Sequence, residues 1–215
     1  MNKNEKYVIT INRELGSGGR TVGRKLAEKL GVAFYDKAVI KALEEKYDLS
    51  VEEIEKLKGE SHGKWIDIKR VVAGSLRDDR FYQVNLGEEH AQETSDEMFQ
   101  TETELLKAIA EEESCVIAGR LGFYVFRDHP NHLSILIQAS MPFRVKRVAS
   151  KQNMSEDEAR KAIEKMDRMR ENYVNMYAHT SRYDTRNYDL VISMDDMSED
   201  NAVAAIMDIV NRMGR

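Results

Sequence analysis

The segment 7–36 constrains the fold more than any other part of the chain, because its hydrophobic period changes across a glycine-rich loop. Residues 7–11 are an apolar, β-branched run with the length of a buried strand. Residues 12–19 are polar and contain three glycines, which are Gly16, Gly18 and Gly19. From residue 21 to residue 30 the apolar side chains recur at helical spacing, and Gly31 supplies a helix stop. The segment therefore predicts a strand, a loop and a helix in that order.

This order gathers backbone N–H groups at the start of a helix, where an anion can bind. The phosphate-binding pattern G-x-x-x-x-G-K-S/T is matched in register over residues 14–21, where Gly19 and Thr21 agree with it. Glu14 stands at the first glycine, and Arg20 stands at the lysine. Arg20 can carry positive charge to phosphates as a planar fork, and the Thr21 hydroxyl suits Mg²⁺. The alternative is a tight turn that only needs glycines, but three glycines within four residues, followed by Arg20 and Thr21, favour phosphate binding.

Composition excludes several classes of protein. The chain has 215 residues, which is enough for one domain with its own core. Its formal net charge of −5 argues against a nucleic-acid partner. The single cysteine, Cys115, allows no internal disulfide and fits a reducing compartment. No hydrophobic signal core or membrane-length apolar run is present, so we expect a soluble, cytoplasmic protein without a membrane partner.

Apolar strand-like runs recur along the chain, and helical patterns separate them. The predicted strands are 7–11, 32–35, 115–118, 133–139 and 189–193. Helices are predicted from Lys37 to Tyr47, from Ser95 to Glu113, from Met141, from a capping box at Ser155–Glu158 to about Tyr177, and from Ser198 to Met213. This alternation predicts an α/β fold with a five-stranded parallel sheet between helices. Residues 48–95 have no clean period.

Residues 12–40, NRELGSGGRTVGRKLAEKLGVAFYDKAVI, resemble the opening of the cytidylate kinase-like family, within the nucleoside monophosphate kinase branch of P-loop proteins. The similarity resumes at 115–120, where Cys-Val-Ile-Ala-Gly-Arg stands, and continues through 132–147. It returns at 163–173, which includes the run Asp-Arg-Met-Arg-Glu-Asn-Tyr, and at 188–193. Residues 50–95 match only loosely.

The resemblance implies a three-layer α/β/α fold of the P-loop NTPase type, formed by a single kinase domain. The core would be 1–47 and 96–215, the helical acceptor-binding insert about 48–95 and the lid about 150–187. The implied activity is the Mg²⁺-dependent transfer of a phosphoryl group from ATP to a nucleoside monophosphate. CMP or dCMP is the acceptor that the family suggests first. The implied partner is a small-molecule nucleotide, and the oligomeric state is left open.

The resemblance also implies roles for individual residues. The donor phosphates and Mg²⁺ would be held by Gly16, Ser17, Gly18, Gly19, Arg20 and Thr21, with Thr21 as the metal ligand. The acceptor would be bound by Asp36 and Arg120, and charge in transfer would be neutralised by Arg20, Arg168 and Arg170. Alternatives are a helix cap for Asp36 and a solvated charged face for the lid arginines. Weaker candidates are Arg70, Arg77 and Arg80 for the acceptor and Arg182 and Arg186 for the lid.

Departures from the family pattern support a second hypothesis. Ala118 stands where closer cytidylate kinases have an aspartate, and Asn172 stands where they have a further arginine. Together with Glu14, Arg20 and the loosely matched residues 48–95, the change at 118 motivates the alternative of a nucleotide-binding regulatory module, or of a P-loop kinase of a different small-molecule acceptor. Tight nucleotide binding without transfer would indicate the regulatory module.

Overall fold

The structure is a computed structural model that describes residues 1–36 and 96–213. The predicted helix at 37–47, the predicted insert at 48–95 and the acceptor candidates Arg70, Arg77 and Arg80 lie outside the described residues. In the ranges that are described, no helix is both long enough and apolar enough to cross a bilayer.

The centre of the fold is a parallel sheet of five strands in the order β2-β3-β1-β4-β5. The strands are β1 (Val8–Arg13), β2 (Ala33–Tyr35), β3 (Cys115–Ala118), β4 (His132–Gln138) and β5 (Leu190–Ser193). Val8 of β1 is in register with Cys115 of β3 on one side and with His132 of β4 on the other. The predicted five-stranded parallel sheet is therefore confirmed, with strand ends shifted by one or two residues at most of the boundaries.

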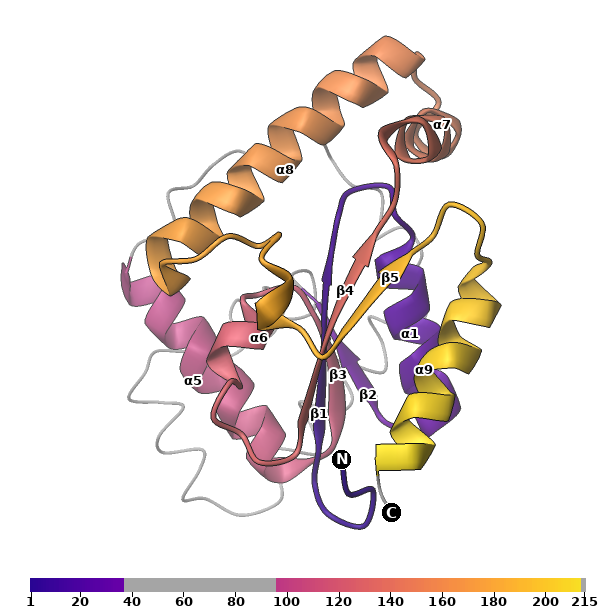
Figure 1. Ribbon diagram of the computed structural model, residues 1–215. Coiled ribbons are helices and arrows are strands. Elements are labelled where there is room, and N and C mark those ends of the chain that lie inside the picture. Colours follow the sequence, from indigo (N-terminus) through magenta and orange to yellow (C-terminus); the bar gives the residue numbers. More distant parts are fainter. Residues whose placement is uncertain (37–95, 214–215) are drawn as a thin grey trace.

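Helices cover both faces of this sheet (Figure 1). The helices are α1 (Gly19–Leu30), α5 (Asp96–Glu112), α6 (Gly122–Val125), α7 (Met141–Gln152), α8 (Glu156–Ala178) and α9 (Glu199–Met213), with a 3₁₀ turn η2 (Thr185–Asn187). Helices α1 and α9 lie side by side on one face, and α5 and α6 lie on the other. This is the three-layer α/β/α arrangement that the alternation of elements predicts.

The two faces of the sheet bury separate apolar clusters because successive side chains of a strand point to opposite sides. Ile9 and Ile11 of β1 are fully buried with Leu26 of α1 and Ile206 of α9. Val8 is fully buried in the other cluster, which α5 completes. A parallel sheet buried on both faces explains why the strands are nearly continuous apolar runs.

Helices α7 and α8 stand beyond the carboxyl ends of the central strands (Figure 1). Ser140 caps α7 by accepting a hydrogen bond from the backbone nitrogen of Phe143. The predicted capping box of Ser155 and Glu158 is present at the start of α8, which ends one residue after Tyr177. Ligands of parallel α/β sheets collect at this edge, so the two helices frame the candidate site.

Candidate active site

The loop between β1 and α1 has the backbone of an anion-binding turn. Gly16 and Gly18 have φ angles of 84° and 88°, a left-handed conformation that a side chain would strain. Ser17 between them is fully buried, and its Oγ donates to the Glu14 carbonyl at 3.0 Å. The backbone nitrogen of Gly19 donates to the same Oγ at 3.4 Å. Alternating left-handed residues before a helix turn N–H groups toward one concavity, as a phosphate loop requires.

Glu14 braces this loop from the position where the motif has a glycine. Its Oε2 accepts a hydrogen bond from the backbone nitrogen of Ala139 at 3.0 Å, just after β4. Its Oε1 lies 3.6 Å from Nη2 of Arg144, a buried residue of α7. The carboxylate therefore joins the loop to the β4–α7 junction, which gives the departure from the motif a structural purpose.

Arg20 and Asp36 form an ion pair. Nε of Arg20, in the first turn of α1, donates to Oδ2 of Asp36 at 2.6 Å. Asp36 follows β2 and is only 2% exposed, whereas the Arg20 side chain is 33% exposed, so the pair is shielded from water on the Asp36 side. The structure brings together the two residues that the sequence assigns to the donor and acceptor sides.

The residues at this edge fit a magnesium ion that substrate phosphates share. Thr21 follows Arg20 in the first turn of α1 and offers a hydroxyl oxygen. Within 1–36 and 96–213, no group of three or more His, Cys, Asp or Glu residues could hold a metal by itself. Kinase magnesium sites need few protein ligands, because phosphates and water complete the octahedron. Thr21 suits such a site.

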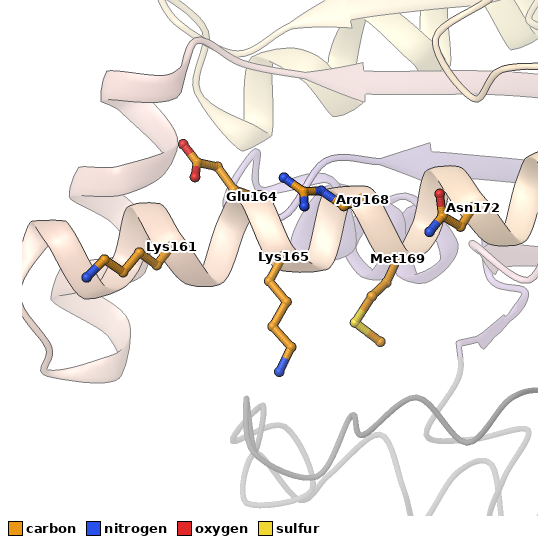
Figure 2. Close-up of a pocket in the computed structure, with 6 residues that line it drawn as sticks. All are labelled: Lys161, Glu164, Lys165, Arg168, Met169 and Asn172. Carbon is orange, nitrogen blue, oxygen red and sulfur yellow. The ribbon is translucent and has the colours of Figure 1, made fainter.

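The two predicted lid arginines lie on different sides of α8. Arg170 is half-buried, and its Nη1 donates to the carbonyl of Arg13 at 3.4 Å. Arg168 is exposed and lines a hollow of about 290 Å³ together with Lys161 and Lys165 (Figure 2). Residues two apart on a helix do not share a face. The structure thus brings Arg170, and not Arg168, against the end of β1.

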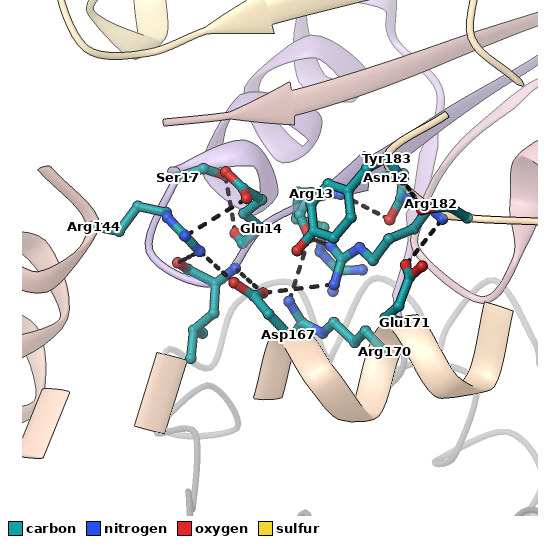
Figure 3. A network of polar contacts seen from close by, with 12 residues as sticks. Asn12, Arg13, Glu14, Ser17, Arg144, Asp167, Arg170, Glu171, Arg182 and Tyr183 are labelled. Carbon is teal, nitrogen blue, oxygen red and sulfur yellow. Dashed lines mark hydrogen bonds and ion pairs between the residues drawn. The ribbon is translucent and has the colours of Figure 1, made fainter. Parts of the chain in front are cut away.

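Asp167 links the helices α7 and α8 to the phosphate loop (Figure 3). Its Oδ1 accepts a hydrogen bond from the backbone nitrogen of Leu15 at 3.3 Å and lies 3.6 Å from Nη1 of Arg182. Its Oδ2 is paired with Nη1 of Arg144. The carboxylate is buried, so each partner contributes to holding α8 in this position.

Arg120 lies just after β3 and points toward α5. Its guanidinium pairs with Glu102 of α5, and both side chains are largely buried. The guanidinium carbon lies 5.8 Å from the ring centroid of Tyr173 on α8, whose hydroxyl donates to Glu102 at 3.4 Å. Arg120 also has a φ of 54°, and left-handed backbone at a non-glycine residue is typical of functional sites. Glu102 thus supplies a carboxylate to Arg120, which stands two residues after Ala118.

Arg13 and Arg182 also lie in the site. Sequence patterns assigned no role to Arg13 and made Arg182 only a weak candidate. Arg182 is fully buried, and its Nη2 donates to the Arg13 carbonyl at 2.5 Å. Burial, and next the positive charge of Arg170, lower the pKa of Arg13 to about 9. Arg13 ends a strand, and Arg182 lies in an irregular segment between α8 and η2 where no periodicity marks it. For Arg13, the one sequence signal was its position directly before the glycine-rich loop.

Arg186, the other weak candidate, stays at the surface. Its side chain is 88% exposed and is bound to Asp184 two residues before it. The pair raises the pKa of Arg186 and lowers the pKa of Asp184, mainly through their side-chain hydrogen bonds.

Comparisons with known proteins agree with this geometry. The model of the cytidylate kinase-like family matches residues 8–196. A cytidylate kinase of Sulfolobus acidocaldarius is 27% identical over 152 residues, which are 68% of this chain and 82% of that protein.

Solved structures share the fold. An uncharacterized protein from Eubacterium ventriosum superposes with a TM-score of 0.66 at 25% identity, over 95% of this chain and 98% of that one. A shikimate kinase from Bacteroides thetaiotaomicron gives a TM-score of 0.50 at 13% identity, over 95% and 98% of the two chains. At that identity the second likeness concerns the fold alone. With its family model matched from β1 to beyond β5, the chain belongs to the cytidylate kinase-like family of nucleoside monophosphate kinases.

Proposed function

We propose that the protein transfers the γ-phosphoryl group of ATP to a nucleoside monophosphate, with CMP or dCMP as the preferred acceptor. The observation that carries the proposal is the contact that α8 and the segment after it make with the end of β1, where the phosphate loop begins. Arg170 and Arg182 both donate to the carbonyl of Arg13, beside the left-handed glycines of the loop. Cations beside a nest of N–H groups are the arrangement that phosphoryl transfer needs.

In the proposed reaction an oxygen of the acceptor's phosphate forms a bond to the γ-phosphorus. The bond from that phosphorus to the β–γ bridging oxygen breaks, and its electron pair leaves on ADP. The products are ADP and a nucleoside diphosphate, and the ionised acceptor needs no general base. Catalysis is then mainly positioning and charge neutralisation.

The donor half of the site is assigned to the phosphate loop. Backbone N–H groups of residues 16–19 hold the phosphates, and the Arg20 guanidinium bridges them while Asp36 fixes its Nε. Thr21 would hold Mg²⁺, which screens the phosphates when bound. Charge neutralisation is assigned to Arg20 and Arg170, with a smaller share for Arg168 because it lies on the exposed side of α8.

The acceptor half is assigned to Asp36 and Arg120. Arg120 follows β3, the neighbour of β1, so its guanidinium approaches the acceptor from the adjacent strand. Glu102 and Tyr173 hold this guanidinium in place. We assign residues 48–95 as the acceptor-binding insert and 150–187 as the lid. The single buried Cys115 supports a cytoplasmic protein.

The test is an assay of ADP release with ATP and Mg²⁺ against CMP, dCMP, UMP, AMP and GMP. We expect turnover with a pyrimidine monophosphate. Arg120→Lys keeps a charge beside Glu102 but removes the fork, so the KM for the acceptor should rise by about tenfold or more. Arg127→Lys is the matched control, because Arg127 is half-exposed and makes local contacts, with Asp128 and Tyr124.

Outcomes of the same assay separate the alternatives. Binding of ATP without release of ADP for any acceptor would favour a nucleotide-binding regulatory module. Release only with an acceptor that is not a nucleotide would favour a P-loop kinase of another small molecule. Either result would overturn the proposal.

A further inference from the structure

Arg13 occupies a space that two glycines leave open. A Cβ atom built on Gly19 would lie 2.6 Å from Cβ of Arg13, and one built on Gly119 would overlap its Nη1. Gly19 begins α1 after the phosphate loop, and Gly119 follows β3, just before Arg120. The side chain of Arg13 therefore runs from the donor half of the site to the acceptor half, between the two backbones.

The charges around Arg13 are mostly positive. The charges of Arg170, Arg182 and Arg20 all disfavour its protonated form, and Asp36 is the carboxylate that favours it. Asp36 is already bound to Arg20. No carboxylate of residues 1–36 and 96–213 forms an ion pair with Arg13 itself.

Arg144 shows how this fold treats a buried arginine with a structural role. Its guanidinium pairs with Asp167 and lies 3.6 Å from Glu14, so two carboxylates neutralise it. Arg13 is less buried than Arg144, but withdrawing even part of a cation from water without such partners is costly. A structural purpose for Arg13 would call for the same neutralisation, which the described part of the chain does not supply.

Arg182 adds donors that the described residues do not use. It is fully buried, and its Nε and Nη1 have no hydrogen-bond acceptor in the described part of the protein, although Nη1 lies 3.6 Å from Asp167. Leaving a buried donor without an acceptor is unfavourable. Arg13, Arg170 and Arg182 meet at one point in Figure 3, at the end of β1.

We propose that Arg13 is a phosphate-binding residue, whose guanidinium spans the donor and acceptor halves and holds the phosphoryl group in transfer together with Arg170 and Arg182. The ligand chemistry is a dianionic phosphoryl group, which fits planar guanidinium forks. The inference rests on the proposed function, in which the γ-phosphoryl leaves the bridging oxygen of ADP and bonds to the acceptor oxygen. Arg13 contacts oxygens of this group and exchanges no proton with it.

The test compares Arg13→Lys and Arg13→Met with the wild-type protein. We expect kcat to fall by about 10²-fold or more in Arg13→Met, with a smaller loss in Arg13→Lys, because one cation at a developing charge has this effect. The KM for the acceptor should change much less than kcat. Inorganic tripolyphosphate should raise the melting temperature of the wild type and not of Arg13→Met. Arg212→Met, which removes an exposed arginine of α9, should behave as the wild type does.

The outcomes separate this inference from the proposed function. If the wild type phosphorylates a monophosphate and Arg13→Met keeps its kcat, the inference is wrong and the function stands. If no acceptor is phosphorylated but tripolyphosphate still stabilises the wild type and not Arg13→Met, the anion site stands and the function fails.

A measurement on the wild type covers the case in which the variants do not fold. Phenylglyoxal modifies accessible arginines, and mass spectrometry locates the modified residues. Protection of Arg13 by tripolyphosphate, with Arg186 modified equally in both samples, supports the proposal. Equal modification of Arg13 with and without tripolyphosphate overturns it.

Discussion

Oδ1 of Asp167 accepts a hydrogen bond from the backbone nitrogen of Leu15 at 3.3 Å, which joins the middle of α8 to the phosphate loop. The same carboxylate is paired with Arg144 of α7 and lies 3.6 Å from Arg182. One buried acid thus fixes three segments that are far apart in the sequence. It also sets the distance at which Arg170 meets the end of β1.

Asp167→Asn should destabilise the fold and reduce turnover together. The amide can still accept from Leu15, but Arg144 and Arg182 lose their shared charge partner, and breaking a buried pair costs about 3 kcal/mol. Urea unfolding measures this loss of unfolding free energy. Asp196→Asn is the control, because Asp196 is exposed. Equal unfolding free energies for Asp167→Asn and the wild type would contradict the account.

Gly119→Ala and Gly31→Ala separate backbone strain from the displacement of Arg13. Gly119 and Gly31 have φ angles of 83° and 70°, so alanine should cost about 1 kcal/mol of stability at either position. A Cβ at Gly31 meets nothing within 4 Å, whereas one at Gly119 overlaps Arg13.

Steady-state kinetics of the two glycine variants give the readout. We expect Gly119→Ala to lose about 10²-fold in kcat, because the Arg13 guanidinium must move away from the phosphoryl group. Gly31→Ala should keep the wild-type kcat. Similar kinetics for both variants would show that the position of Arg13 has no effect on turnover.

Arg170→Met and Arg168→Met test the two sides of α8. Only Arg170 contacts the end of β1, so its loss should lower kcat by about 10²–10³-fold. The decrease in kcat of Arg168→Met should be smaller by about tenfold or more, because Arg168 lies on the exposed side of α8 with Lys161 and Lys165. Equal losses at both positions would mean that α8 turns about its axis during the reaction.

His132 should make the fold less stable in mild acid. Burial lowers the pKa of His132 from 6.5 to about 4, although the charge of Asp189 opposes the shift. The unfolded chain therefore binds a proton below about pH 6.5 that the folded chain does not, so stability falls as the pH decreases from there toward 4.

Urea unfolding at pH 8 and pH 5 checks the role of His132. Protonation of His132 in the unfolded chain should lower the unfolding free energy of the wild type by about 2 kcal/mol between pH 8 and pH 5. His132→Gln keeps a hydrogen-bond partner for Thr10 Oγ1, which lies 2.7 Å from Nε2 of the histidine. The variant should lose less stability than the wild type over the same range. The same pH dependence in both would contradict the assignment.

Much of the fold could be predicted because β1, β3 and β4 are apolar runs whose composition suits a sheet buried on both faces. The capping box at Ser155 could also be predicted, because two side chains at a fixed spacing, Ser155 and Glu158, accept hydrogen bonds from backbone N–H groups at the start of α8. Helix α1 begins at Gly19, two residues before the predicted start, because Gly18 adopts a left-handed conformation and caps it.

The site was less predictable where contacts come from distant segments. An irregular segment brings Arg182 to β1, and Glu102 reaches Arg120 from α5. No regular spacing in the sequence indicates either contact. The purpose of Glu14 likewise depends on Ala139 and Arg144, which follow it by more than 120 residues. Arg168 and Arg170 share a motif, but helical geometry puts them on different sides.

The most direct test of the central claim is to follow the phosphorus atoms by ³¹P NMR in a mixture of the protein, ATP, Mg²⁺ and CMP. Transfer to a nucleoside monophosphate predicts the coupled α and β signals of CDP, growing in step with ADP and without inorganic phosphate. Growth of ADP with inorganic phosphate and no CDP, for CMP and then for the other monophosphates, would contradict the account.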